Sequence, residues 1–150
     1  MSLNGVELPL VFKFINAIYR ALIERFGEDS WEVLWRSGEI LFKELKDDIG
    51  VTEDMEINHA VQRLCDYMRR IRIVDKIEYI FNEDNSTIET VVHFPFDINM
   101  YKREMAGPIY IFSSLLTSVL QYIGYRLERG GEHYILDKNK LVEKWRITKI

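Results

Sequence analysis

Residues 76–94, KIEYIFNEDNSTIETVVHF, mark the point where the sequence changes from a helical to a strand pattern. On both sides of a central segment, apolar residues alternate with polar or opposite-face residues, as in strands that bury one face. The positions of one face are Ile77, Tyr79, Phe81, Ile88, Thr90, Val92 and Phe94. The segment 82–86 between them is rich in Asn, Asp and Ser, which favour turns. The stretch therefore predicts a β-hairpin.

Three helices are predicted before this hairpin. The first runs from roughly Glu7 to Arg25, because apolar residues recur there at helical spacing. Gly27 stands where a C-terminal cap is expected. Asp29, with Glu32 three residues later, has the spacing of a capping box that opens the second helix.

The second helix is predicted to end before Gly50, and the third to begin at a Thr52 cap. The apolar face of the second helix contains Trp31, Leu34, Trp35, Gly38, Leu41, Phe42 and Leu45. The third helix buries a stripe that contains Ile57, Val61, Leu64, Cys65 and Met68. The arginines at 69–72 follow this stripe, and their charge suits the negative end of the helix dipole.

After the hairpin, an irregular stretch that includes residues 99–104 leads to a helix predicted from Pro108 to Ile123. The range 105–125 carries no charge and is long enough to cross a bilayer. However, one stripe of the helix is polar, which is rare in a lipid-facing span. This stripe contains Ser113, Ser114, Thr117, Ser118 and Gln121. We therefore expect a buried central helix and no membrane span.

The last residues alternate again and predict a three-stranded meander. Its strands lie around 125–127, 134–136 and 145–147, with turns at 130–131 and 137–140. The predicted fold class is α+β, with three helices, a hairpin, a long buried helix and this meander. The helices are expected to pack on an antiparallel sheet, in one domain that spans residues 1–150.

Composition indicates a globular chain in a reducing compartment. The chain has 150 residues, 47% of them hydrophobic, which is enough to fill a core at this length. The net charge of −4 and the shortness of the basic cluster at 69–72 argue against nucleic-acid binding. The single cysteine, Cys65, cannot form an internal disulfide, and no signal-peptide pattern opens the sequence. These features predict a cytosolic protein.

The sequence contains no recognisable motif for catalysis or metal binding. His59, His93 and His133 lie on separate predicted elements without a second ligand at metal-binding spacing, so we expect no metal. Cys65 lies on an apolar helix stripe, where a cysteine acts as a small hydrophobe. An enzymatic function is a third hypothesis. It would need a wet cleft that joins two or more of these histidines and Glu53.

Gly38 supports two interpretations. It interrupts the aromatic face of the second helix, where glycine costs about 1 kcal/mol relative to alanine. The space it leaves suits either a crossing helix or a ligand, and the nearby aromatic residues suit either a core or a pocket. If a ligand is present, we expect it to be enclosed by Trp35, Gly38, Phe42, Phe112, Leu116 and Tyr134.

Two functions follow from these alternatives. The first is a cytosolic module that binds a small hydrophobic ligand, stabilised by about 25 cal/mol per Å² of buried apolar surface. The second is a protein-interaction subunit with a filled core, which forms a homodimer through a face of its first or second helix. An interior with spare room would favour the first function, and a packed interior the second.

The whole pattern resembles the 4-vinyl reductase-type small-molecule-binding domain. Residues 31–42 are similar to the family's second helix, and 60–94 to its helix–hairpin unit. The closing helix and meander are matched by Gly107-Pro108, Leu115-Leu116, Gly124-Tyr125-Arg126-Leu127, Tyr134-Ile135 and Trp145-Arg146-Ile147. The resemblance covers most of the chain.

This resemblance implies a fold shared with subunits of the transport-protein-particle (TRAPP) complex and with haem–nitric-oxide sensor domains. It implies a cavity between helices and sheet for an apolar ligand or acyl chain, and dimerisation through helices. Many members hold a metal through cysteines in the closing meander, but residues 136–147 contain none. Haem sensors of this fold use a ligating His and a Tyr-x-Ser-x-Arg string that contacts the haem. His93 is the one plausible axial ligand in this sequence, but the string is missing. We therefore expect no haem or other cofactor.

Overall fold

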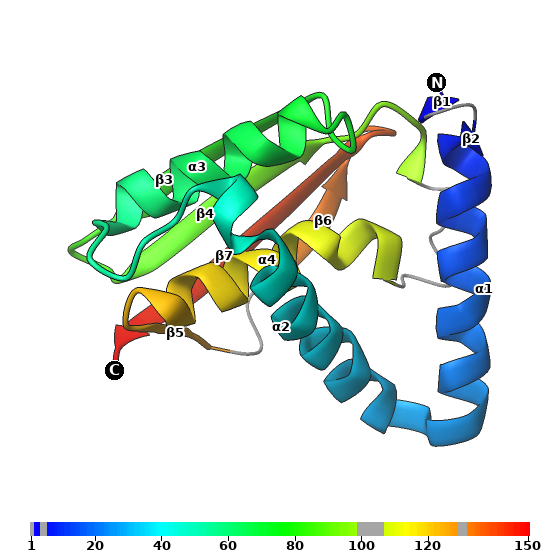
Figure 1. Ribbon diagram of the computed structural model, residues 1–150, viewed down its shortest axis with the longest axis horizontal. Helices are drawn as coiled ribbons and strands as arrows, with labels where there is room; N and C mark the ends of the chain where they lie inside the picture. Colours follow the sequence, from blue (N-terminus) through cyan, green and yellow to red (C-terminus); the bar gives the residue numbers. More distant parts are fainter. Residues whose placement is uncertain (1, 4–5, 99–106, 129–131) are drawn as a thin grey trace.

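The computed structural model describes residues 2–3, 6–98, 107–128 and 132–150 (Figure 1). Its helices are α1 (Leu8–Phe26), α2 (Ser30–Ile49), α3 (Ile57–Arg70) and α4 (Gly107–Tyr122). Its strands are β1 (Ser2–Leu3), β2 (Val6–Glu7), β3 (Lys76–Asn82), β4 (Thr87–His93), β5 (Tyr125–Leu127), β6 (Glu132–Leu136) and β7 (Lys140–Lys149). The α+β class is confirmed, because the helices pack on a five-stranded antiparallel sheet. The predicted features at 99–104 and 130–131 lie outside the described residues.

The long strand β7 organises this sheet. It pairs with β4 on one edge, while β6 and β5 pair one after the other along its other edge. The predicted three-stranded meander is therefore wrong in its pairing, because β5 contacts β7 rather than β6. Strand length explains the difference: β7 has ten residues, whereas β5 has three and β6 has five. Both short strands fit along a strand of that length.

One face of the sheet carries the core. Ile88 and Val92 on β4, and Leu141 and Ile147 on β7, alternate toward this face and are at most 2% exposed. Helices α3 and α4 lie side by side against it, and Figure 1 shows α4 crossing the sheet next to α3. The expected hairpin and the inward positions of its second strand are confirmed.

Helix α4 is buried, as predicted. Its residues Phe112, Leu115, Leu116, Val119 and Leu120 are at most 2% exposed, so most of its apolar surface contacts protein. Within the described ranges, none of the helices has the length and apolar character needed to cross a membrane.

Two predicted helix caps are wrong. Asp29 has helical backbone angles and no side-chain capping bond, because α1 and α2 are joined by a 3-10 turn, Gly27–Asp29. Ser30 instead donates a hydrogen bond to the Gly27 carbonyl at 2.5 Å. Thr52 does not cap α3, which begins at Ile57, because the Thr52 hydroxyl is bonded to Asp54 at 2.6 Å. The C-terminal cap of α2 is confirmed at Gly50, whose φ of 81° suits glycine.

Helices α2 and α4 approach each other closely at Gly38. A Cβ added to Gly38 would lie 2.6 Å from the Ser114 Cβ and 3.0 Å from the Ser114 backbone carbon. A real Cβ would not tolerate these distances, so the crossing requires glycine at this position. The helix-crossing interpretation of Gly38 therefore holds.

We predict that Gly38→Ala destabilises the protein by about 1–3 kcal/mol, because α4 must move to make room for the methyl group. The intrinsic preference of alanine for helix, about 1 kcal/mol, acts in the opposite direction and is outweighed. Urea denaturation measures the change. Ser37→Ala, at the exposed neighbouring position, should leave stability within about 0.5 kcal/mol. An alanine variant at Gly38 as stable as the native chain would contradict a tight crossing.

Candidate functional site

The residues predicted to enclose a ligand do not share one cavity. Phe112 and Leu116 lie in the core at 2% and 0% exposure. Tyr134 is 55% exposed and lies on β6 opposite Val142. Because side chains alternate along a strand, Tyr134 lies on the sheet face opposite to Leu141 and the core. Tyr134 is therefore separated from Phe112 by the sheet.

The other three predicted residues lie along α2 and line separate hollows. Trp35 contributes to a cleft between α2, α4, β5 and β7. Gly38 contributes to a groove between α1, α2 and α4. Phe42 is buried in an edge-on contact with Tyr122 of α4, with ring centroids 5.5 Å apart, and lines a third hollow.

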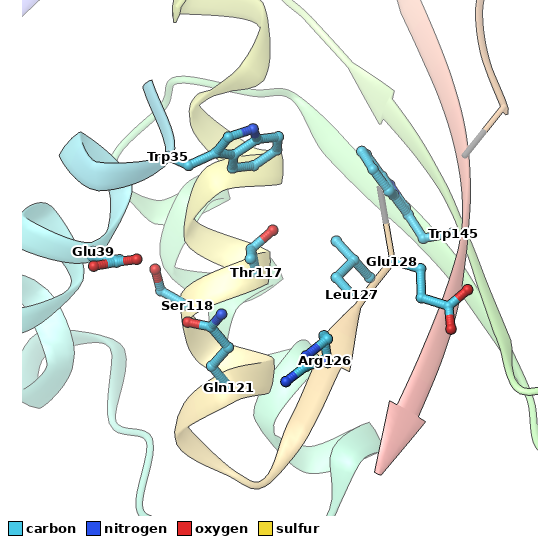
Figure 2. Close-up of a pocket in the computed structure, with 9 residues that line it drawn as sticks. All are labelled: Trp35, Glu39, Thr117, Ser118, Gln121, Arg126, Leu127, Glu128 and Trp145. Carbon is cyan, nitrogen blue, oxygen red and sulfur yellow. The ribbon is translucent and has the colours of Figure 1, made fainter. Parts of the chain in front are cut away.

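The cleft next to Trp35 has a volume of about 420 Å³ (Figure 2). Such a volume falls in the range of small-molecule sites, roughly 300–1,000 Å³. Its walls mix charged, polar and apolar side chains: Trp35, Glu39, Thr117, Ser118, Gln121, Arg126, Leu127, Glu128 and Trp145. Figure 2 shows Glu39 on the α2 side and Arg126 on the β5 side, with Ser118 and Gln121 of α4 between them.

Two buried polar atoms border this cleft without a hydrogen-bond partner in the described part of the chain. They are the hydroxyl of Ser118 and the indole nitrogen of Trp145. A buried polar group without a partner costs about 1–3 kcal/mol, so such groups commonly indicate a bound water or ligand. The rings of Trp35 and Trp145 meet edge-on, with centroids 6.4 Å apart, and close one end of the cleft.

The groove next to Gly38 is different in character. Its volume is about 250 Å³, and its lining is mostly apolar: Ile15, Ile18, Tyr19, Leu22, Val33, Leu34, Ser37, Gly38, Leu41, Ile111 and Ser114. Several of these side chains are also exposed, including Ile18 at 47% and Val33 at 38%. The groove therefore forms part of a larger apolar surface.

That surface continues over the outer side of α1. Leu10 and Phe14 are 61% and 66% exposed, and Ala17 and Ala21 are exposed between them and the helix end. Spaced at 100° per residue, these positions share one stripe, opposite the side that faces α2 and α4. A helix with apolar residues on two opposite sides needs partners on both.

Sequence analysis missed a buried acid, Glu143. It lies on the core face of β7 at 1% exposure and accepts a hydrogen bond from Ser113 of α4. Burial raises the pKa of Glu143 to about 7, and the Ser113 bond opposes part of this rise. Thr90 lies opposite Glu143 on β4, and its hydroxyl is also buried without a partner among the described residues. The alternation Leu141, Glu143, Trp145 was the signal for an inward-facing carboxyl group.

The residues considered for catalysis are dispersed. His59 is exposed on α3, Glu53 is exposed in the loop before it, and His133 is exposed on β6. His93 ends β4 and lies 3.5 Å from Glu78 of β3. The described residues contain no group of three or more His, Cys, Asp or Glu side chains suited to a metal ion. Cys65 is 5% exposed in the core, and burial raises its pKa to about 12, so the nucleophilic thiolate is scarce.

Comparison with known proteins supports the fold alone. No protein-family model and no curated protein sequence matches the chain. A solved structure of a trafficking protein particle complex subunit 3 from Naegleria fowleri, covalently bound to palmitic acid, is similar with a TM-score of 0.56. The alignment covers 94% of this chain and 97% of that chain at 12% identity. The chain therefore has a TRAPP-like fold.

We predict that Glu143 makes stability fall as pH rises. Its pKa is about 7 when folded against an ordinary value of 4.5, so the folded state binds the proton more tightly. Its stabilising effect is complete below pH 4.5 and is lost as pH rises through 7, a change of about 3 kcal/mol. Urea midpoints from pH 4.5 to 8 measure it.

The variant Glu143→Gln keeps a hydrogen-bonding group but cannot ionise, so its midpoint should lack this decline and exceed the native value at pH 8. Glu89→Gln on the other face of β4 is the matched control and should retain the native profile. Parallel pH profiles for the native chain and Glu143→Gln would refute the assignment.

Proposed function

We propose that the chain is a protein-interaction subunit that pairs with a second copy of itself through α1. The observation that carries this proposal is the exposed apolar stripe of α1, formed by Leu10, Phe14, Ala17, Ile18 and Ala21. Short helices are stabilised in water mainly by tertiary packing, and large exposed apolar patches mark interfaces. A partner on this stripe would complete the packing of α1.

The order of large and small side chains favours a second copy as the partner. A symmetric dimer brings the same surface of both chains together. If two α1 helices cross antiparallel about an axis between Ala17 and Ile18, Phe14 meets the partner's Ala21. Ile18 then meets the partner's Ala17, so each bulky side chain faces a methyl group. Leu10 meets the aliphatic stem of Arg25, which can cover apolar surface while its charge stays in water.

The position of α1 also supports this proposal. Figure 1 shows α1 at the edge of the molecule, and its inner side contacts α2 and α4. Lys13, Arg20 and Glu24 project to one side of α1, whereas Arg25 is the one charged residue on the stripe, at its C-terminal end. The structural neighbour is itself described as a subunit of a complex, which fits an interaction module.

A second candidate function is the binding of a small apolar ligand, as the 4-vinyl reductase-type resemblance implies. The observation that favours it is the apolar groove next to Gly38. The neighbour holds palmitic acid covalently, but the one cysteine of this chain is buried with a raised pKa. A ligand of this chain would therefore bind without a covalent bond to Cys65. A cytosolic location remains a prediction for both candidates.

We predict that Phe14→Glu separates the dimer. A carboxylate within an apolar interface, one helical turn from its axis, should cost at least about 2 kcal/mol, which raises the dimer Kd about 30-fold or more. Sedimentation equilibrium between about 1 and 100 µM covers the relevant range of Kd. Circular dichroism checks that the variant is folded.

Lys13→Glu introduces the same side chain at the neighbouring position on the charged side of α1, and should leave the dimer intact. If the native chain sediments as a monomer at about 100 µM, pairing through α1 is refuted. Native mass spectrometry of that monomer would then test the second candidate, because a co-purified apolar molecule should be seen.

A further inference from the structure

We propose that the cleft between α2, α4, β5 and β7 binds a small zwitterionic amino acid with an apolar side chain. This inference is independent of the dimer, because the cleft residues Glu39, Arg126 and Trp145 are not part of the α1 stripe or of the groove next to Gly38. The cleft differs from an apolar acyl site in that three charged side chains, Glu39, Arg126 and Glu128, line it.

Glu39 and Arg126 carry opposite charges and lie on different walls of the cleft. Glu39 extends from α2 and Arg126 from β5, with the floor formed by α4 between them (Figure 2). Within the described residues the Arg126 guanidinium has no ion-pair partner, and Glu39 is paired with Arg36 of its own helix at 2.6 Å. That pair is exposed and contributes little, so the Glu39 carboxylate remains able to bind an ammonium group. A ligand that carries both an ammonium and a carboxylate would complement both walls.

The floor of the cleft supplies neutral hydrogen-bonding groups. The Ser118 hydroxyl is buried and has no hydrogen-bond partner among the described residues, and it can donate to a carboxylate or accept from an ammonium. Thr117 donates to the Ser113 carbonyl at 2.9 Å, which leaves its oxygen free to accept. The Gln121 amide is exposed at the mouth of the cleft and offers both a donor and an acceptor.

The remaining wall is apolar. Leu127 is buried at 8% exposure, and the edge-on pair of Trp35 and Trp145 continues this surface. An aromatic or branched aliphatic side chain would bury surface here, whereas a hydroxylated or charged one would leave its polar groups unpaired. The single guanidinium disfavours a nucleotide, whose several phosphates require more than one cation. Glu128, the other carboxylate of the cleft, lies across it from Glu39 (Figure 2). The described residues contain no group of three or more side chains suited to a metal ion, which disfavours a divalent cation here.

Calorimetric titration with L-phenylalanine tests this inference directly. The native protein should bind it at concentrations below about 10 mM. 3-Phenylpropionate lacks the ammonium group and phenethylamine lacks the carboxylate, so each should bind at least about tenfold more weakly. Equal binding of 3-phenylpropionate and L-phenylalanine would overturn the zwitterion assignment, and no heat from any of the three would overturn the site.

Two variants test whether Arg126 binds the ligand's carboxylate and Glu39 its ammonium. Arg126→Gln should weaken L-phenylalanine at least about tenfold and leave phenethylamine unchanged, because only the carboxylate is affected. Glu39→Gln should weaken L-phenylalanine similarly and leave 3-phenylpropionate unchanged. Glu44→Gln, on α2 but outside the cleft, is the matched control and should bind like the native chain. Equal losses for all three ligands in Arg126→Gln would indicate a general structural effect and contradict the inference.

Discussion

The close contact between Gly38 of α2 and Ser114 of α4 sets the positions of the hollows on both sides of α2. Glycine allows the two backbones to approach within a distance that any side chain would prevent. Trp35 and Glu39 then face the cleft on one side of this crossing, while Leu34 and Leu41 face the apolar groove on the other. A wider crossing would change the width of both hollows together. Packing inside the molecule and recognition outside it therefore depend on the same contact.

The distribution of apolar surface explains why an interaction function is favoured over a deep ligand cavity. Phe112, Leu116 and Leu120 are almost completely buried, so the space between α4 and the sheet is occupied by the protein's own side chains. Leu10, Phe14 and Ile18 expose apolar surface on α1 and along the groove, at the edge of the molecule. Ile80, Tyr134 and Leu136 are exposed on strands of the sheet. Apolar surface at an edge is accessible to another chain, whereas apolar surface in the interior is accessible only to a ligand that can enter.

The sequence predicted the elements better than their contacts. Helical spacing and strand alternation depend on local neighbours, so α1, α2, the hairpin and α4 were recovered with nearly correct bounds. Pairing between β5 and β7 joins residues about twenty positions apart, and local alternation carries no information about such a partner. The same limit applied to the site. Aromatic character suggested Tyr134, but its side of the sheet depends on the register with β7. Glu39 and Arg126 were not predicted at all, because each looks like an ordinary exposed charge on its own element.

The polar stripe of α4 shows how one sequence feature can serve two surfaces. Hydroxyl groups at 113, 114, 117 and 118 were sufficient to predict a buried helix, but they do not all point the same way. Ser113 faces the sheet and donates to Glu143, whereas Ser114 packs against Gly38. One turn later, Thr117 and Ser118 line the open cleft. A helix with only leucine at these positions would bury more apolar surface, but Glu143 would lose its hydrogen-bond donor and the cleft its polar floor. The polar stripe of α4 therefore contacts both the buried acid of the core and the cleft where a polar ligand would bind.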